Sequence, residues 1–272
     1  MTLTRAQVIE LLARADRSPS RALGQNFVVD PNTVRRIARL AGVGPGDQVV
    51  EIGAGLGSLT LALAETGAAV TAVEIDRHLV PLLRETVEPA GVTVVQGDAM
   101  ALDWTALLVG GPWVLVANLP YNVATPLVAD LLDTVPAVTR MLVMVQREVG
   151  ERLAAGAGDD AYGAVSVKVA YWATAKVVGV VPPTVFLPKP KVDSALVAIE
   201  RRAEPATDAP RERLFQLVRA GFGQRRKMLR RSLADLVTAE AFAQANIRPE
   251  SRAEELDVEA WGRLARCSLE RS

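Results

Sequence analysis

The 272-residue sequence contains one cysteine, Cys267, and one histidine, His78. A single cysteine excludes a disulfide within the chain, and one residue of each kind cannot supply a cysteine–histidine zinc site. A cysteine–histidine nucleophile pair would need both residues to meet, but His78 lies in a stretch of helical pattern far from Cys267. We therefore expect no metal in the chemistry of this protein and no catalytic histidine.

Long apolar runs are also missing, although 50% of the residues are hydrophobic. No stretch of about 18 apolar residues is free of charge, so we expect no membrane-spanning helix and no membrane partner. Residues 1–16 lack the basic start, apolar core and small-residue cleavage site of a signal peptide. These absences predict a cytoplasmic protein.

Net charge is absent as well, because 31 basic residues balance 31 acidic ones. The distribution is uneven, however: residues 211–231, RERLFQLVRAGFGQRRKMLRR, hold eight basic residues and one acid. A local basic cluster in a neutral chain is typical of a protein that binds an anion at one place. A solvated helix face would have the same composition, so both interpretations stay open.

The central part of the chain alternates short apolar runs with helical patterns, which predicts an α/β fold with a doubly wound parallel sheet. Two further runs, 177–181 and 195–199, are separated by a proline-rich loop and predict a terminal antiparallel pair. The predicted parallel strands are 48–52, 70–75, 92–96, 113–117 and 141–146, and the predicted helices are 33–41, 58–66, 77–87, 126–133 and 147–155.

The pattern after Pro210 is helical to the end, and the stretch 202–210, RAEPATDAP, has the composition of a linker. The sequence therefore predicts two domains. Residues 1–202 form an N-terminal segment with a Rossmann-like domain, and residues 210–272 form a small all-helical domain.

A glycine-rich turn follows the first predicted strand, with Gly53, Gly55 and Gly57 in the segment EIGAGLG. Glycine lets a backbone turn sharply and approach a ligand closely. Glu74 ends the next strand, where an acid can accept both hydroxyls of a ribose, and Asp98 ends the third, where a carboxylate can accept an adenine amine. The G-x-G-x-G spacing differs from the dinucleotide G-x-G-x-x-G, and a dehydrogenase needs no third acid. We predict S-adenosylmethionine as the cofactor rather than NAD.

The fourth predicted strand ends in Asn118-Leu119-Pro120-Tyr121, at the same sheet edge. The amine of adenine is a poor nucleophile, because its lone pair is delocalised into the ring. An asparagine oxygen and a backbone carbonyl beside Pro120 can accept its two hydrogens, and a tyrosine can stack on the base. Acceptors in a dry pocket also stabilise positive charge on the nitrogen. This tetrapeptide predicts methylation of an adenine N6.

These segments resemble the small-subunit rRNA dimethyladenosine transferases over about residues 21–235. The resemblance implies that the chain methylates two adjacent adenosines in a hairpin near the 3′ end of 16S rRNA, twice each, late in small-subunit assembly. The matching stretches are GQNFVVDP (24–31), VVEIGAGLGSLT (49–60), AVEIDR (72–77), GDAM (97–100), NLPYNVATP (118–126), VQREVGERL (145–153), YGAVSV (162–167), VPPTVFLPKPKVDSALV (181–197) and FGQRRKMLRRSL (222–233).

The same resemblance assigns roles to single residues. Tyr121 and Phe186 are the expected aromatic walls for the base, and Asn118 is shared by cofactor and base. Val28 stands where leucine is common, which a backbone contact tolerates. The cofactor contacts that it implies are Asn26, Val28, Gly53, Glu74, Asp98 and Asn118.

We expect the basic cluster to hold rRNA phosphates, with helical spacing that pairs Arg226 with Arg230 and Lys227 with Arg231. Its members are Arg225, Arg226, Lys227, Arg230 and Arg231. The expected partner is 16S rRNA within the small subunit, bound by a monomer.

Three alternatives remain. One is a large-subunit rRNA adenine methyltransferase of the macrolide-resistance type, against which the VDSALV and FGQRRKMLRR segments speak. The second is a mainly non-catalytic assembly factor, and the third is a small-molecule methyltransferase, which leaves the basic cluster unexplained.

Overall fold

The computed structural model describes residues 2–20, 23–120 and 123–269. Their contacts define two compact units, Met1–Gly150 with Lys176–Glu200, and Glu151–Ala175 with Arg201–Ser272. The sequence predicted a division into 1–202 and 210–272, and the structure differs from it at residues 151–175. These residues group with the C-terminal helices because Tyr162, Val167 and Tyr171 are buried in the same apolar cluster as Leu214 and Trp261.

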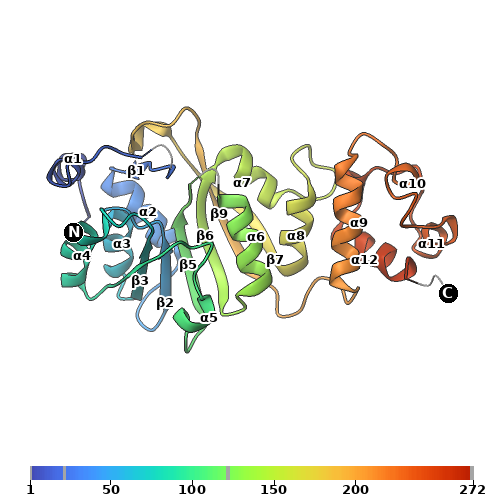
Figure 1. The fold of residues 1–272 in the computed structure, drawn as a ribbon, viewed down its shortest axis with the longest axis horizontal. Helices are drawn as coiled ribbons and strands as arrows, with labels where there is room; N and C mark the ends of the chain where they lie inside the picture. Colours follow the sequence, from blue (N-terminus) through green and yellow to red (C-terminus); the bar gives the residue numbers. More distant parts are fainter. Residues whose placement is uncertain (1, 21–22, 121–122, 270–272) are drawn as a thin grey trace. The chain divides into compact units, whose positions relative to one another are not determined.

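A seven-stranded sheet forms the centre of the first unit, with the strand order β4-β3-β2-β5-β6-β9-β7 (Figure 1). Strands β4, β3, β2, β5 and β6 are parallel to their neighbours, and β9 runs antiparallel to β6. This confirms the predicted parallel sheet. The strands are β2 (Gln48–Ile52), β3 (Ala69–Glu74), β4 (Thr93–Gln96), β5 (Trp113–Asn118), β6 (Val138–Gln146), β7 (Ala173–Val181) and β9 (Ser194–Arg201).

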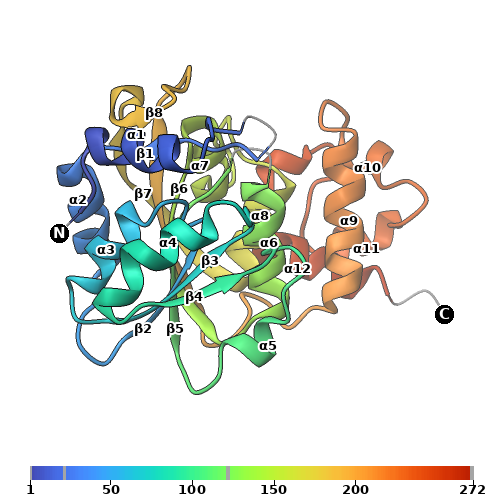
Figure 2. The same ribbon diagram turned by 60° about the vertical axis from the view of Figure 1, so that its left-hand side comes forward.

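Helices cover both faces of this sheet (Figure 2). Helices α2, α3 and α4 lie on one side, where their apolar residues share a core with Val49, Val70 and Val116. Helices α5 and α6 lie on the other side. The helices of this part are α1 (Arg5–Arg14), α2 (Pro31–Ala41), α3 (Ser58–Ala64), α4 (Val80–Val87), the 3₁₀ turn η1 (Glu88–Ala90), α5 (Trp104–Leu107), α6 (Ala124–Thr134), α7 (Arg147–Ala154) and the 3₁₀ turn η2 (Pro183–Val185).

The start of α2 shows how local chemistry sets an element. The side chain of Asp30 accepts the Thr33 N–H at 2.8 Å, and Pro31 occupies the first helical position, where no N–H is needed. Gly42, with φ +60°, ends the helix in the left-handed conformation that glycine adopts without strain. The sequence predicted this helix from the same residues.

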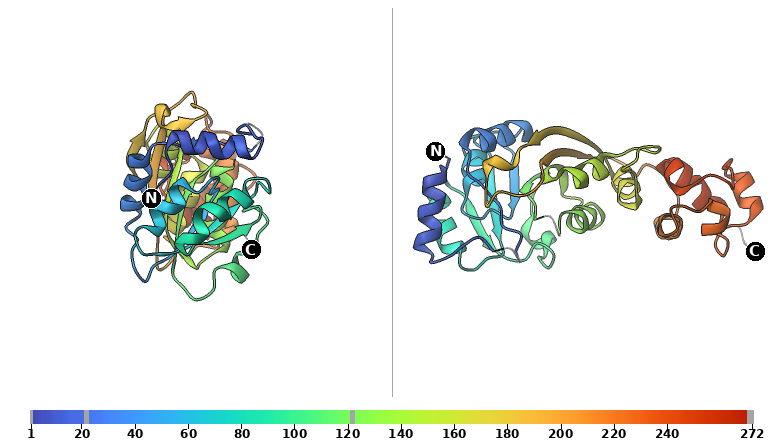
Figure 3. Two further views of the ribbon diagram at one scale, coloured as in Figure 1. Left: turned by 90° about the vertical axis from the view of Figure 1, so that its left-hand side faces the viewer. Right: turned by 90° about the horizontal axis from the view of Figure 1, so that it is seen from above.

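A second, two-stranded sheet was not predicted. It pairs β1 (Phe27–Val28) with β8 (Phe186–Leu187), two segments far apart in the sequence. Helix α1 lies beside β8 (Figures 2 and 3), and the guanidinium of Arg5 donates to the Phe186 carbonyl at 3.4 Å. This ribbon fixes the N-terminal segment, residues 23–28, which enters the site described below.

The second unit is helical and has its own core around Trp261. The sequence predicted helical spacing through the basic cluster, and this is wrong. Helix α9 ends at Gly223, residues 224–228 are not helical, and α10 begins at Leu229. The helices are α8 (Ala164–Trp172), α9 (Arg211–Gly223), α10 (Leu229–Ser232), α11 (Ala239–Gln244), the 3₁₀ turn η3 (Ala253–Glu255) and α12 (Val258–Cys267).

Among the described residues of both units, no helix is long and apolar enough to cross a membrane.

Candidate functional site

The carboxyl ends of four parallel strands meet at one edge of the sheet. Strand β2 leads into the glycine turn, β3 ends at Glu74, β4 leads to Asp98, and β5 ends at Asn118. Ligands of open α/β sheets bind at this edge. The structure thus brings together the residues that the sequence predicted for cofactor and base.

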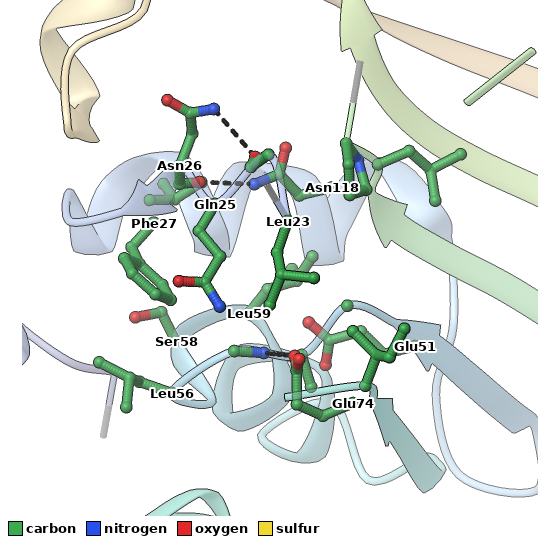
Figure 4. A pocket seen from close by; sticks show the side chains of 18 residues that line it. Leu23, Gln25, Asn26, Phe27, Glu51, Leu56, Ser58, Leu59, Glu74 and Asn118 are labelled. Carbon is green, nitrogen blue, oxygen red and sulfur yellow. Dashed lines mark hydrogen bonds between the residues drawn. The ribbon is translucent and has the colours of Figure 1, made fainter. Parts of the chain in front are cut away.

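Two adjoining cavities open at this edge. The first is lined by residues 23–28, the glycine turn, Glu51, Glu74 and Asn118 (Figure 4). The second is lined mostly by apolar side chains and holds Asp98. The residues that line both are Leu23, Gly53, Ile75 and Pro120.

The glycine turn has three residues with positive φ: Gly53 at +74°, Gly55 at +59° and Gly57 at +92°. At Gly55 a Cβ atom would come within 2.9 Å of the Phe27 ring, which covers the turn from the N-terminal segment. The Gly53 N–H donates to the Val73 carbonyl at 2.9 Å, which ties the turn to β3. Glycine is therefore required here both by conformation and by space.

Glu74 is 4% exposed, and its two carboxylate oxygens are fixed by the backbone. Oε2 accepts the Gly55 N–H at 2.6 Å, and Oε1 accepts the Asp76 N–H at 2.8 Å. Burial raises the pKa of Glu74, while the hydrogen bonds from Asp76 and Gly55 act in the opposite direction. Each oxygen keeps a lone pair for a further donor, as a ribose diol requires.

Asp98 faces the second cavity, among Val73, Ile75, Ala99 and Met100. Its Oδ1 accepts the Met100 N–H at 2.9 Å, so Oδ2 is left for a ligand. Apolar walls with one carboxylate at the rim suit a flat base that carries an exocyclic amine.

Asn118 has an amide whose orientation is fixed. Its Nδ2 donates to the backbone carbonyl of Asn26 at 2.9 Å, and a carbonyl can only accept (Figure 4). The Oδ1 atom is therefore the free end of this amide. It is an acceptor at the rim of the cofactor cavity, as methylation of an adenine amine requires.

The neighbours of Asn118 divide the remaining roles. The Pro120 carbonyl accepts the N–H groups of Val123 and Ala124, both at 3.1 Å, and so helps to start α6. The Leu119 carbonyl has no such bond among the described residues, which makes it the backbone acceptor beside Asn118. Tyr121, the predicted stacking residue, lies outside the described residues.

Phe186, the other predicted aromatic wall, lines neither cavity. Its side chain is 1% exposed and belongs to the apolar core, and its backbone pairs with Val28 in the β1–β8 ribbon. In this structure the ring supports the N-terminal segment, so stacking on a base would require the ring to become exposed.

The N-terminal segment supplies one wall of the first cavity, which includes Asn26 and Val28, as the sequence predicted. Gln25 holds it in place. Its Nε2 donates to Asp76 Oδ2 at 3.0 Å, and its Oε1 accepts the Ser20 N–H at 2.8 Å. Sequence reasoning missed Gln25, because its partners are set by the fold. It also missed Glu51, although an acid inside the apolar run VVEI was a visible signal.

The basic cluster lies in the second unit. Arg225 pairs with Glu254 at 2.6 Å, and Arg230 pairs with Glu250 at 3.5 Å. Arg226, Lys227 and Arg231 are exposed, and none of the described residues forms an ion pair with them. The cluster thus has three unpaired cations rather than five, and the expected repulsion of helical pairs does not arise.

This site defines a class of protein. A glycine turn, a fixed acid for a ribose, an acid in an apolar cavity and an oriented asparagine at the next strand end fit S-adenosylmethionine and an adenine amine. The buried acids and the turn that a Cβ would fill show that the residues present can hold this cofactor. The chain is an S-adenosylmethionine-dependent RNA adenine methyltransferase.

More particularly, the chain belongs to the family described as ribosomal RNA adenine dimethylase, whose profile matches residues 18–268. Two similar relatives are named ribosomal RNA small subunit methyltransferase A. The relative from Thermobifida fusca is 50% identical and covers 97% of this chain and 95% of its own length. The relative from Streptomyces coelicolor is 48% identical, with 96% and 94% covered.

Solved structures agree on the fold. A dimethyladenosine transferase from Plasmodium falciparum superposes with a TM-score of 0.74 at 24% identity, covering 86% of this chain and 94% of its own. The 23S rRNA methyltransferase ErmE superposes with a TM-score of 0.68 at 26% identity, covering 90% of this chain and 100% of its own. The predicted Rossmann-like methyltransferase fold is confirmed.

Proposed function

We propose that this protein dimethylates N6 of two adjacent adenosines in the 3′-terminal hairpin of 16S rRNA, late in assembly of the small ribosomal subunit. It acts as a monomer in the cytoplasm. The observation that carries the proposal is the amide of Asn118, whose Nδ2 is held by the Asn26 carbonyl so that Oδ1 is the free acceptor.

In this proposal the residues around β5 bind and orient the target amine. Asn118 Oδ1 accepts one N6–H and the Leu119 carbonyl accepts the other, which turns the nitrogen lone pair toward the cofactor cavity. S-adenosylmethionine supplies an electrophilic methyl group. The two acceptors stabilise the positive charge that grows on the nitrogen, and the surplus proton leaves to solvent without a strong base.

The choice of the small subunit is supported by identity. Relatives named for the small subunit are 48–50% identical over nearly the whole chain, whereas the 23S rRNA methyltransferase is 26% identical. A mainly non-catalytic assembly factor would not need Glu74, Asp98 and Asn118 together at one sheet edge.

The test is transfer of labelled methyl groups to subunits purified from cells that lack this modification. Small subunits should be labelled and large subunits should not, and an Asn118→Ala variant should label neither. Labelling of large subunits by the wild-type protein would instead support the macrolide-resistance type of activity.

A further inference from the structure

Glu51 is a buried acid for which the function described so far has no use. It lies in β2, on the same face of the sheet as Val49, and is 2% exposed. Its side chain lines the first cavity, on the same side as Glu74 and opposite Asn26 and Asn118 (Figure 4).

One oxygen of this carboxyl lacks a partner. Glu51 Oε2 accepts no hydrogen bond from any described residue. The nearby Thr60 hydroxyl, itself buried, falls short of hydrogen-bond geometry with it. An ionised carboxylate that is buried without a partner is strongly unfavourable, so the group must either stay neutral or meet a cation.

The groups that face Glu51 supply no cation. Glu74 comes from β3 and carries the same charge, Thr60 comes from α3, and Asn118 comes from β5. Asn26 and Gln25 enter from the N-terminal segment and are neutral. None of the described residues that line the first cavity is basic.

A cation reaches this cavity with the cofactor. S-adenosylmethionine carries two, the ammonium of its amino acid part and the sulfonium, and the product S-adenosylhomocysteine keeps only the ammonium. We propose that Glu51 is the counter-charge for a cationic group of S-adenosylmethionine, and that cofactor binding at neutral pH converts its carboxyl to a carboxylate and releases the proton to solvent.

The protonation of the free protein fits this role. Burial raises the pKa of Glu51 to about 8, the Thr60 hydroxyl opposes the shift, and the charge of Glu74 adds to it. At pH 7 the free carboxyl is therefore mostly protonated. A cation beside it favours the ionised form, so affinity for the cofactor rises with pH until the free group has ionised.

Isothermal titration calorimetry at pH 7, in two buffers of different ionisation enthalpy, measures the proton release. The wild-type protein should release close to one proton per S-adenosylmethionine bound. The amine of the ligand can only take up protons when it binds as ammonium, so a release must come from the protein. Glu51→Gln should release none and should bind the cofactor about tenfold more weakly or worse.

The matched control is Glu88→Gln, which removes an exposed carboxylate from η1 and should keep the release. Repeating the titration with S-adenosylhomocysteine identifies the cation. Loss of the release assigns the sulfonium, and an unchanged release assigns the ammonium; both support the proposal.

An infrared difference spectrum of the wild-type protein gives a second reading that needs no variant. Cofactor binding should remove a protonated-carboxyl C=O band and add a carboxylate band. No proton release with no change in these bands, or a full release in Glu51→Gln, would overturn the proposal.

Discussion

At the scale of single residues, the site depends on polar groups that the backbone holds in one orientation. Glu74 accepts N–H groups from Gly55 and Asp76, and Asn118 donates to the Asn26 carbonyl. Each of these bonds uses one part of the side chain and leaves another for a ligand. Preorganisation of this kind avoids reorientation at the moment of binding or reaction.

Replacing Glu74 by alanine should abolish cofactor binding. The ribose hydroxyls lose an acceptor for two charge-assisted hydrogen bonds, worth roughly 1.5–3 kcal/mol each, so calorimetry should show an affinity at least about 100-fold lower. An unchanged affinity would mean that Glu74 serves the turn and not the ligand.

Replacing Asn118 by alanine should lower kcat by a factor of about 100 or more, because the acceptor of one N6–H is lost. Thermal unfolding and binding to small subunits should change little, since the side chain is only half-buried at the end of β5. Methylation of small subunits at the normal rate would disprove the acceptor role.

Glu51 should make the stability of the free protein depend on pH. Its pKa is about 8 in the folded protein, against 4.5 as the ordinary value, so the folded state binds the extra proton. Stability should therefore fall as pH rises from about 4.5 to 8. In Glu51→Gln the fall in melting temperature over this window should be smaller. Equal pH profiles would place Glu51 in contact with water.

The acids at strand ends were predictable because position in a parallel sheet follows from chain order. Glu74, Asp98 and Asn118 needed only that rule. The burial of Phe186 and the hydrogen bonds of Gln25 were not predictable, because both depend on a two-residue pairing between distant segments. Tyr121 remains a prediction.

At the scale of elements, the parallel strands were predicted to within a few residues, because buried strands are continuous apolar runs. Helix α8 was not predicted, since AVSVKVAYW is rich in β-branched residues and has no polar face. Tertiary packing against α9 and α12 overrides this local preference. The glycine turn between β2 and α3 is the element on which the site depends most.

Gly57 allows a direct test of this turn against a matched control. Gly57 and Gly46 both have φ +92°, but a Cβ at Gly57 would meet Val87 Cγ1 at 2.5 Å, and at Gly46 it would meet nothing within 4 Å. Alanine at either position strains the backbone, and at Gly57 it also overpacks the core. Gly57→Ala should therefore be less stable than Gly46→Ala by roughly 1–3 kcal/mol in denaturant unfolding. Equal losses would show that α4 moves aside easily.

At the scale of the whole molecule, the chain consists of two compact units with different chemistry. The first holds the cofactor site, whose first cavity has no basic side chain among its described lining residues, and the second holds the basic cluster. The sequence placed that cluster correctly in a helical region but predicted continuous helix across it. Gly223 and the non-helical residues 224–228 interrupt the helix, so the spacing argument failed there.

We expect the unpaired cations of the cluster to hold rRNA phosphates. Replacing Arg226, Lys227 and Arg231 by alanine should weaken binding to small subunits and lower the salt slope by about one for each phosphate that the protein no longer neutralises. Alanine at Arg225 or Arg230 should have a smaller effect, because Glu254 and Glu250 already pair with them. Cofactor affinity should not change. An unaltered salt slope would show that the cluster is only a solvated surface.

The central claim is that this site methylates adenine N6 in small-subunit rRNA, and the most direct measurement is mass spectrometry of rRNA from unmodified small subunits incubated with the protein and S-adenosylmethionine. The account predicts N6,N6-dimethyladenosine at two adjacent positions near the 3′ end of 16S rRNA, with two methyl groups on each. Dimethyladenosine in 23S rRNA alone, or a small subunit that binds the protein and gains no methyl group, would contradict it.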